Sequence, residues 1–246
     1  MLKLITFVSL LVSQVAAHGW VQEITLGSKV YTGFLPNTDN AQNPPPARIV
    51  RRIPDFNPIT DLTRIDLQCG GSPTYQTAPA PLVGQIAAGE TAKLNWTAWP
   101  ANHKGPVLTY LAKAPEGVDI TQWLPGTDAV WFKIDEVGKE NGRWAASDLL
   151  TAASGVWSVK IPENLAPGQY ILRNEIIDLH SATTYPGIQF FPSCAQIEVT
   201  GSGTGVPTEL VSIPGVYTPE SPGIVWDIGV EGDYTPPGPS VWTGEV

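Results

Sequence analysis

Residues 91–98, TAKLNWTA, decide the fold class, because small or apolar side chains alternate strictly with polar ones. A period of two is typical of a strand with one buried face, whereas an amphipathic helix repeats every 3.6 residues. Similar segments bounded by glycine and proline predict further strands at residues 24–31 (a hairpin), 64–69, 107–113, 130–135, 156–161, 170–179 and 188–199. Since no long segment has helical periodicity, the sequence predicts an all-β protein, an immunoglobulin-like or fibronectin-like β-sandwich with long loops.

Two segments lack this pattern. Residues 34–60 contain three consecutive prolines and few apolar anchors, which predicts a surface loop. From Gly201 the chain is rich in Gly, Ser, Thr and Pro, but large apolar residues recur, namely Ile213, Tyr217, Ile224, Trp226 and Trp242. We therefore expect this segment to wrap the same domain, so that residues 18–246 form a single catalytic-type domain without a separate carbohydrate-binding module.

The first seventeen residues have the features of a secretory signal peptide. Lys3 is the only early charge, residues 4–12 are apolar, and Val15-Ala16-Ala17 is a small-residue cleavage site. The apolar run is too short to span a bilayer. Cleavage after Ala17 would give a secreted, extracellular protein that begins at His18.

The charge balance narrows the choice of partners. The full chain has 14 Lys and Arg against 23 Asp and Glu, a formal net charge of −9. Such an acidic protein is poorly suited to bind nucleic acids or anionic membranes. We expect a soluble monomer with a neutral partner.

Two features fit passage through an oxidising compartment. Cys69 and Cys194 are the only cysteines, and the default expectation there is one disulfide, since neither lies near a histidine at zinc-site spacing. Asn95-Trp96-Thr97 is an N-glycosylation sequon. Asn95 falls on the polar face of its predicted strand, so a glycan there is sterically allowed.

The chain has three histidines. His18 at a free N-terminus could chelate one metal ion through its amino group and ring Nδ1. His103 lies in a loop between two predicted strands, where we expect an exposed side chain that is either a ligand or an ordinary surface histidine. His180 follows an apolar strand, and there we favour a partly buried, structural role. The three nitrogen donors of His18 and His103 suit Cu(II), whereas zinc would prefer a fourth ligand.

Ordered motifs run through the mature chain: HGWV at 18–21, WPANHKGPV at 99–107, WAASD at 144–148, APGQY at 166–170, RNEIIDLHS at 173–181, QFFPSC at 189–194 and PGPSVWTG at 237–244. Together they resemble the fungal cellulose-active lytic polysaccharide monooxygenases, copper enzymes with a "histidine brace". The resemblance implies one copper ion per chain, an external electron donor, and O2 or H2O2 as co-substrate. It also implies oxidative cleavage of β-1,4-glucan in cellulose or a related polysaccharide.

The resemblance further implies roles for individual residues. Copper would be bound by the amino group and ring of His18 and by Nε2 of His103. Gln189 would form hydrogen bonds near the axial copper position, and Tyr234 would stack on a sugar ring. Cys69 and Cys194 would form a family disulfide.

Two positions depart from the family pattern. Asn174 stands where the family is expected to have a catalytic histidine, and Phe191 replaces the axial tyrosine. An amide cannot titrate near neutral pH, and Phe191 shields the axial face without a phenol. These departures suggest attenuated activity, and they motivate an alternative: a secreted copper-binding protein on the same fold with little or no oxygenase activity. A third hypothesis, a metal-free carbohydrate-binding sandwich, leaves His18 and His103 unexplained.

Overall fold

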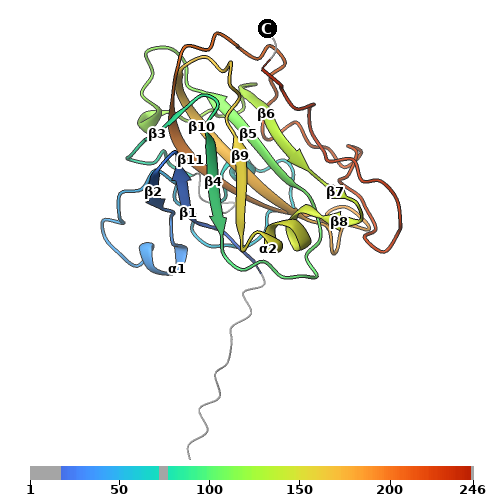
Figure 1. Ribbon diagram of the computed structural model, residues 1–246. Coiled ribbons are helices and arrows are strands. Elements are labelled where there is room, and N and C mark those ends of the chain that lie inside the picture. Colours follow the sequence, from blue (N-terminus) through green and yellow to red (C-terminus); the bar gives the residue numbers. More distant parts are fainter. Residues whose placement is uncertain (1–17, 72–76, 245–246) are drawn as a thin grey trace, which may run out of the picture.

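Two β-sheets face each other in the computed structural model, which describes residues 18–71 and 77–244 (Figure 1). The predicted signal peptide lies outside the described residues. One sheet has the order β2-β1-β4-β9, with strands β1 (Val21–Leu26), β2 (Lys29–Thr32), β4 (Thr91–Trp96) and β9 (Val156–Lys160). The other has the order β3-β11-β10-β5-β6, with strands β3 (Gly84–Ala87), β5 (Val107–Lys113), β6 (Trp131–Val137), β10 (Gly168–Asp178) and β11 (Gln189–Thr200). The predicted β-sandwich is confirmed.

The remaining elements are short. They are a hairpin of β7 (Lys139–Glu140) and β8 (Arg143–Trp144), helices α1 (Pro36–Asp39) and α2 (Leu150–Ala152), 3-10 helices at Ile65–Gln68 and Ile120–Gln122, and a π-helix at Ala145–Leu149. No helix within residues 18–71 and 77–244 is both long and apolar enough to cross a membrane.

The prediction of a strand at residues 64–69 is wrong. Residues 64–69 form the 3-10 helix Ile65–Gln68 rather than a strand. The Arg173 side chain on β10 donates hydrogen bonds to the carbonyl oxygens of Leu67 at 3.0 Å and Gln68 at 2.7 Å. The segment is therefore held to β10 by a side chain rather than by a backbone ladder. The sequence analysis also missed β3, which pairs with β11 in parallel.

The five-stranded sheet is buried on both faces. Between the sheets it contributes Leu172, Ile176 and Phe191 to a core shared with Leu94 and Trp96 of β4. On its other face lies a second apolar cluster, to which the C-terminal segment contributes Ile213, Tyr217, Ile224 and Tyr234. In Figure 1 this segment, coloured orange to red, runs along the outside of the five-stranded sheet. The recurring apolar residues after Gly201 therefore pack on the sandwich.

A disulfide and a buried ion pair hold the outer layer in place. The predicted bond between Cys69 and Cys194 is confirmed and closes a sequence separation of 125 residues, for which the chain-entropy model gives about 5 kcal/mol. Beside it, Arg173 donates to Glu175 at 2.6 Å, and Glu175 also accepts a hydrogen bond at 2.6 Å from the hydroxyl of Tyr217. The C-terminal segment is thus joined to β10 by polar as well as apolar contacts.

Candidate metal centre

The histidines meet at one end of the sandwich. His18 lies three residues before β1, His103 lies in the loop between β4 and β5, and His180 lies two residues after the end of β10. In the β10–β11 register Asp178 is opposite Gln189, and Ile176 is opposite Phe191. Because alternate residues of a strand share one face, Gln189 and Phe191 project on the same side as Asp178.

The chain is fixed just after His18. Trp20 N donates to Thr97 Oγ1 at 3.2 Å, and Thr97 N donates to the carbonyl of Trp20 at 3.0 Å. At Gly19 a Cβ atom would lie only 3.0 Å from Thr97 Oγ1 and 3.2 Å from the Trp99 ring. Glycine thus permits this close approach, which carries the chain past Trp99 and positions His18.

The rings of His18 and His103 lie edge to face, next to the aromatic rings of Trp99 and Phe191. Their centroids are 6.0 Å apart at an interplanar angle of 72°. His18 stacks on Phe191 at 5.2 Å and 25°, and Trp99 contacts both His103 at 6.0 Å and Phe191 at 5.2 Å edge-on. Trp99 Nε1 also donates to the carbonyl of His103 at 2.8 Å, which anchors the loop. The prediction that His103 is exposed is wrong, since only 8% of the residue is accessible.

The surroundings favour neutral imidazoles. Burial lowers the pKa of His18, and the neighbouring His103 and His180 lower it further, while Asp178 opposes them. Burial likewise lowers the pKa of His103, with His180 acting in the same direction and Asp178 again opposing. A neutral ring is the form that binds a metal ion.

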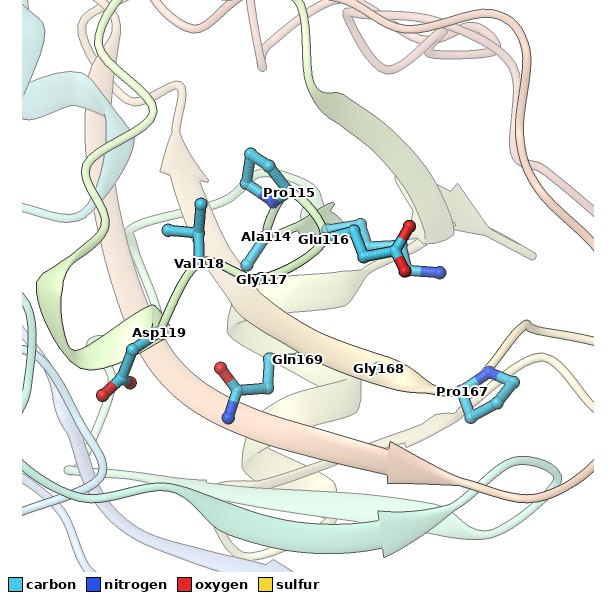
Figure 2. Close-up of a pocket in the computed structure, with 10 residues that line it drawn as sticks. Ala114, Pro115, Glu116, Gly117, Val118, Asp119, Pro167, Gly168 and Gln169 are labelled. Atoms are coloured by element: carbon cyan, nitrogen blue, oxygen red, sulfur yellow. The ribbon is translucent and has the colours of Figure 1, made fainter.

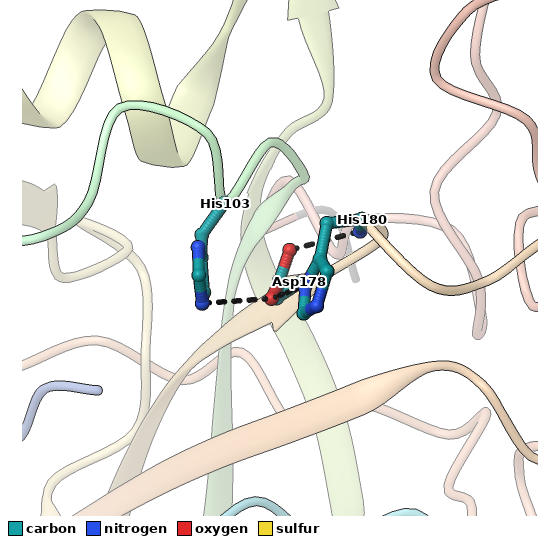
Figure 3. A group of neighbouring side chains, drawn as sticks. All are labelled: His103, Asp178 and His180. Atoms are coloured by element: carbon teal, nitrogen blue, oxygen red, sulfur yellow. Dashed lines mark hydrogen bonds and ion pairs between the residues drawn. The ribbon is translucent and has the colours of Figure 1, made fainter. Parts of the chain in front are cut away.

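His180 belongs to this site. Its ring centroid is 4.6 Å from that of His103, at an angle of 31°. Its Nδ1 is hydrogen-bonded to Oδ2 of Asp178, and the same oxygen lies 3.6 Å from Nε2 of His103 (Figure 3). His180 is therefore satisfied by a neighbour, as predicted, but it is an exposed residue beside the predicted ligand rather than a structural one.

Asp178 was missed by the sequence analysis. Its carboxylate is fully buried, and the ligand atoms of His103, Asp178 and His180 all lie within 4.8 Å of one another, a spacing that could hold a metal ion. The available signal was the alternation in Asp178-Leu179-His180 at the end of an apolar strand, which places both polar side chains on one side.

Asn174 does not lie at this site. It is four residues before Asp178 on β10, which corresponds to about 13 Å along a strand. It is fully buried, its Oδ1 accepts a hydrogen bond from Trp96 Nε1 at 2.9 Å, and its Nδ2 donates to Thr109 Oγ1 at 2.9 Å. The prediction that Asn174 occupies a catalytic position is wrong, because its amide is engaged in the core.

Gln189 and Phe191 keep places consistent with their predicted roles. Phe191 is 4% exposed and covers one face of the His18 ring. Gln189 Oε1 is buried and has no hydrogen-bond partner within the part of the chain that the structure describes. A buried acceptor without a partner is uncommon in native proteins, so this atom fits a site that is completed by a ligand or water.

Tyr234 is not placed to contact a substrate. It is 7% exposed, and its hydroxyl donates to the carbonyl of Gly223 at 2.9 Å. Its ring packs on Trp144 at 5.1 Å and on Trp226 at 5.3 Å. The prediction that this ring stacks on a sugar is therefore wrong.

Another aromatic pair lines a cleft that shares Phe191 with the histidine site. The half-buried rings of Trp20 and Phe56 are 5.2 Å apart, and with Gly19 and Phe191 they line a small cleft. Sequence reasoning missed Phe56 because it lies in the proline-rich stretch that was read only as a surface loop.

A wider groove lies far from the histidines. It is formed by residues 113–119 and 167–169, and Figure 2 shows Glu116, Asp119 and Gln169 at its walls. Gly168 and Asp178 are opposite ends of β10, about 33 Å apart for an extended strand. None of its lining residues is a histidine or a cysteine, so the chemistry of the histidine cluster is not located there.

The site fits a copper ion. Two neutral imidazoles and the amine of a processed N-terminus would supply three nitrogen donors, a set that suits Cu(II). The adjacent ring of Phe191 and the partnerless Gln189 Oε1 agree with a bound ion on this side of the rings.

Comparison with known proteins gives consistent matches. Residues 18–235 match the model of Auxiliary Activity family 9, formerly GH61. The chain is 52% identical over 238 residues to AA9 family lytic polysaccharide monooxygenase A of Gloeophyllum trabeum, an alignment covering 95% of this chain and 74% of that relative. The extended catalytic domain of H. jecorina LPMO9A is similar in structure, with a TM-score of 0.83, 31% identity, and coverage of 93% and 94%. A cellulose-active polysaccharide monooxygenase from M. thermophila has a TM-score of 0.76, 32% identity, and coverage of 92% and 99%.

Proposed function

The chain belongs to Auxiliary Activity family 9, and from this premise we propose that it is a secreted copper-dependent monooxygenase that cleaves β-1,4-glucan chains oxidatively. The observation that carries the proposal is the approach of the His18 and His103 rings, 6.0 Å apart, against Phe191. The proposed partners are a polysaccharide and an external electron donor, and the proposed form is a monomer with one copper ion.

His18 would hold the ion through its amino group and Nδ1, and His103 through Nε2. Bound copper would supply one-electron chemistry toward O2 or H2O2. Phe191 excludes water from one side of the site because its ring covers His18. Gln189 offers a buried acceptor, and the exposed His180 can hold or give up a proton beside the ligands.

The geometry favours an active enzyme over a copper-binding protein without activity. That alternative depended on two departures, an asparagine at position 174 in place of a titratable group and Phe191 in place of an axial tyrosine. Asn174 lies in the core, whereas the imidazole of His180 lies beside His103. Phe191 remains a departure, but it concerns the covering of the axial face rather than proton transfer.

Cellulose is the proposed substrate. One solved relative is titled a cellulose-active enzyme. Tyr234 is buried and cannot stack on a sugar ring, so we propose that Phe56 and Trp20 make this contact. Their partly exposed rings line a cleft with Phe191. Aromatic faces bind sugar rings through their apolar surface.

The test is release of oxidised oligosaccharides from cellulose by protein processed to start at His18, loaded with one copper equivalent and supplied with ascorbate. We expect soluble oxidised products with this protein and none with His103→Ala. A wild type that binds copper but releases no oxidised product from cellulose or from other β-glucans would contradict the proposed function.

A further inference from the structure

We propose that Asp178 is a positioning residue that holds His180 as the Nδ1–H tautomer and so leaves its Nε2 unprotonated beside the ring of His103. The use of Nε2 in the reaction rests on the proposed function. The tautomer itself does not, since it is a property of the metal-free protein.

The carboxylate of Asp178 forms two hydrogen bonds with His180. Its Oδ1 accepts a hydrogen bond from the backbone N of His180 at 3.0 Å, and its Oδ2 is bonded to the ring Nδ1 (Figure 3). Together these contacts fix both the backbone direction and the ring orientation of His180. A carboxylate that is fully buried, as this one is, has no water to satisfy it and depends on such partners.

The chemistry of the pair decides the tautomer. Oδ1 accepts from the backbone N–H of His180, and when Oδ2 likewise acts as an acceptor, Nδ1 of His180 carries the hydrogen. In the neutral ring Nε2 then has a free lone pair, and it points away from Asp178. Oδ2 lies 3.6 Å from His103 Nε2, which is beyond hydrogen-bond distance. The carboxylate is therefore hydrogen-bonded to His180 and not to His103.

A purely structural role is the competing explanation. Asp119 shows what such a role looks like, since its Oδ1 accepts from the backbone N of Thr121 at 2.9 Å without any ring to orient. Asp178 makes the same backbone bond and the ring bond in addition. Asp178→Asn separates the two roles: an amide oxygen can still accept from the backbone, but the amide nitrogen would donate to Nδ1 and favour the Nε2–H tautomer.

The primary experiment is a long-range 1H–15N correlation spectrum of the metal-free protein starting at His18, recorded where the rings are neutral. The chain has three histidines, and His180→Gln identifies the His180 signals. We expect wild-type His180 to be protonated at Nδ1 and bare at Nε2, and Asp178→Asn to shift the tautomer ratio at least tenfold toward Nε2–H. Asp119→Asn, the matched control, should leave the ratio unchanged. A wild-type ring protonated at Nε2, or a ratio unaffected by Asp178→Asn, would overturn the proposal.

A second readout connects the tautomer to the reaction. Copper-loaded Asp178→Asn should release oxidised oligosaccharides about 10- to 100-fold more slowly, the usual cost of losing a partner that orients a group at a metal site, with retention on cellulose unchanged. An altered tautomer with an unaltered rate would overturn the functional part of the inference. A wild type without any activity would instead contradict the proposed function alone, because the spectra still decide the role of Asp178.

Discussion

Asn174 and His180 lie close together in the sequence but in opposite environments. Asn174 is in the middle of β10, fully buried, with its amide bonded to Trp96 and Thr109. His180 lies just past the end of the strand, exposed, with one ring nitrogen bonded to Asp178. The two residues are six positions apart, so the alternation of β10 places them on the same side of the sheet. Their positions along the strand, and not the face, therefore decide which residue lies in the core and which lies at the site.

The largest expected effect tests which residues bind copper. His103→Ala should weaken Cu(II) binding by more than about 100-fold, because loss of a mere supporting residue already costs about 10- to 100-fold. One extra alanine before His18 should have a comparable effect, since the amine leaves the chelate. Calorimetric copper titration of the two variants beside wild type is the measurement.

His180→Ala is the matched comparison and should change copper affinity by less than the roughly tenfold minimum expected for loss of a residue hydrogen-bonded to a ligand, because the His180 ring is bonded to Asp178 instead. If the alanine-extended protein bound copper as tightly as wild type, the metal would be held by His103, Asp178 and His180 instead.

The next effect concerns the core position. Asn174→His should lower the free energy of unfolding by about 1–3 kcal/mol, because a larger ring must fit a fully buried site. Oxidised-product release per folded molecule should be unchanged. Urea unfolding with parallel activity assays measures both. Faster turnover without loss of stability would show that position 174 acts at the copper after all.

Tyr234→Phe should have a smaller effect, about 0.5–1.5 kcal/mol of stability, since it removes only the hydrogen bond to Gly223. Retention on cellulose should stay at the wild-type value, because the ring is buried against Trp144 and Trp226. A pull-down on cellulose next to a thermal unfolding curve checks this. Weaker retention with intact stability would restore Tyr234 as a substrate contact.

The smallest effect is expected at the cleft that Trp20 and Phe56 line. Phe56→Leu should weaken retention on cellulose by about 2- to 10-fold, corresponding to roughly 0.5–1.5 kcal/mol for one aromatic contact. Copper affinity should not change, because Phe56 packs on Trp20 and carries no metal-binding atom. The same pull-down gives the answer, and unaltered retention would exclude this cleft as a sugar contact.

Much of the sandwich was predictable because alternation is a local signal. Residues 91–96 alternate and form β4, whereas residues 107–113 are apolar almost throughout and form β5, which is buried on both faces. The segment around Ile65–Gln68 also alternates, but its backbone is bonded by Arg173, a residue more than a hundred positions away. No local pattern contains that contact.

The site was predictable in part for the same reason. His18 and His103 stand in distinctive motifs, and the two rings do approach each other. The predictions for Asn174 and Tyr234 were wrong. A sequence motif does not show where a strand leaves the core, or which aromatic ring of the C-terminal segment is buried. These depend on tertiary packing, here by Trp96 and Trp226.

The paired hydrogen bonds between Trp20 and Thr97 have a consequence for the strength of metal binding. A chain terminus normally samples many conformations, and freezing one residue costs about 1–2 kcal/mol of backbone entropy. Here that ordering is completed during folding, two residues from His18, by contacts that need no ion. The backbone next to His18 would therefore already be ordered when a metal ion binds. For each residue ordered in advance, the metal affinity rises by roughly 5- to 30-fold.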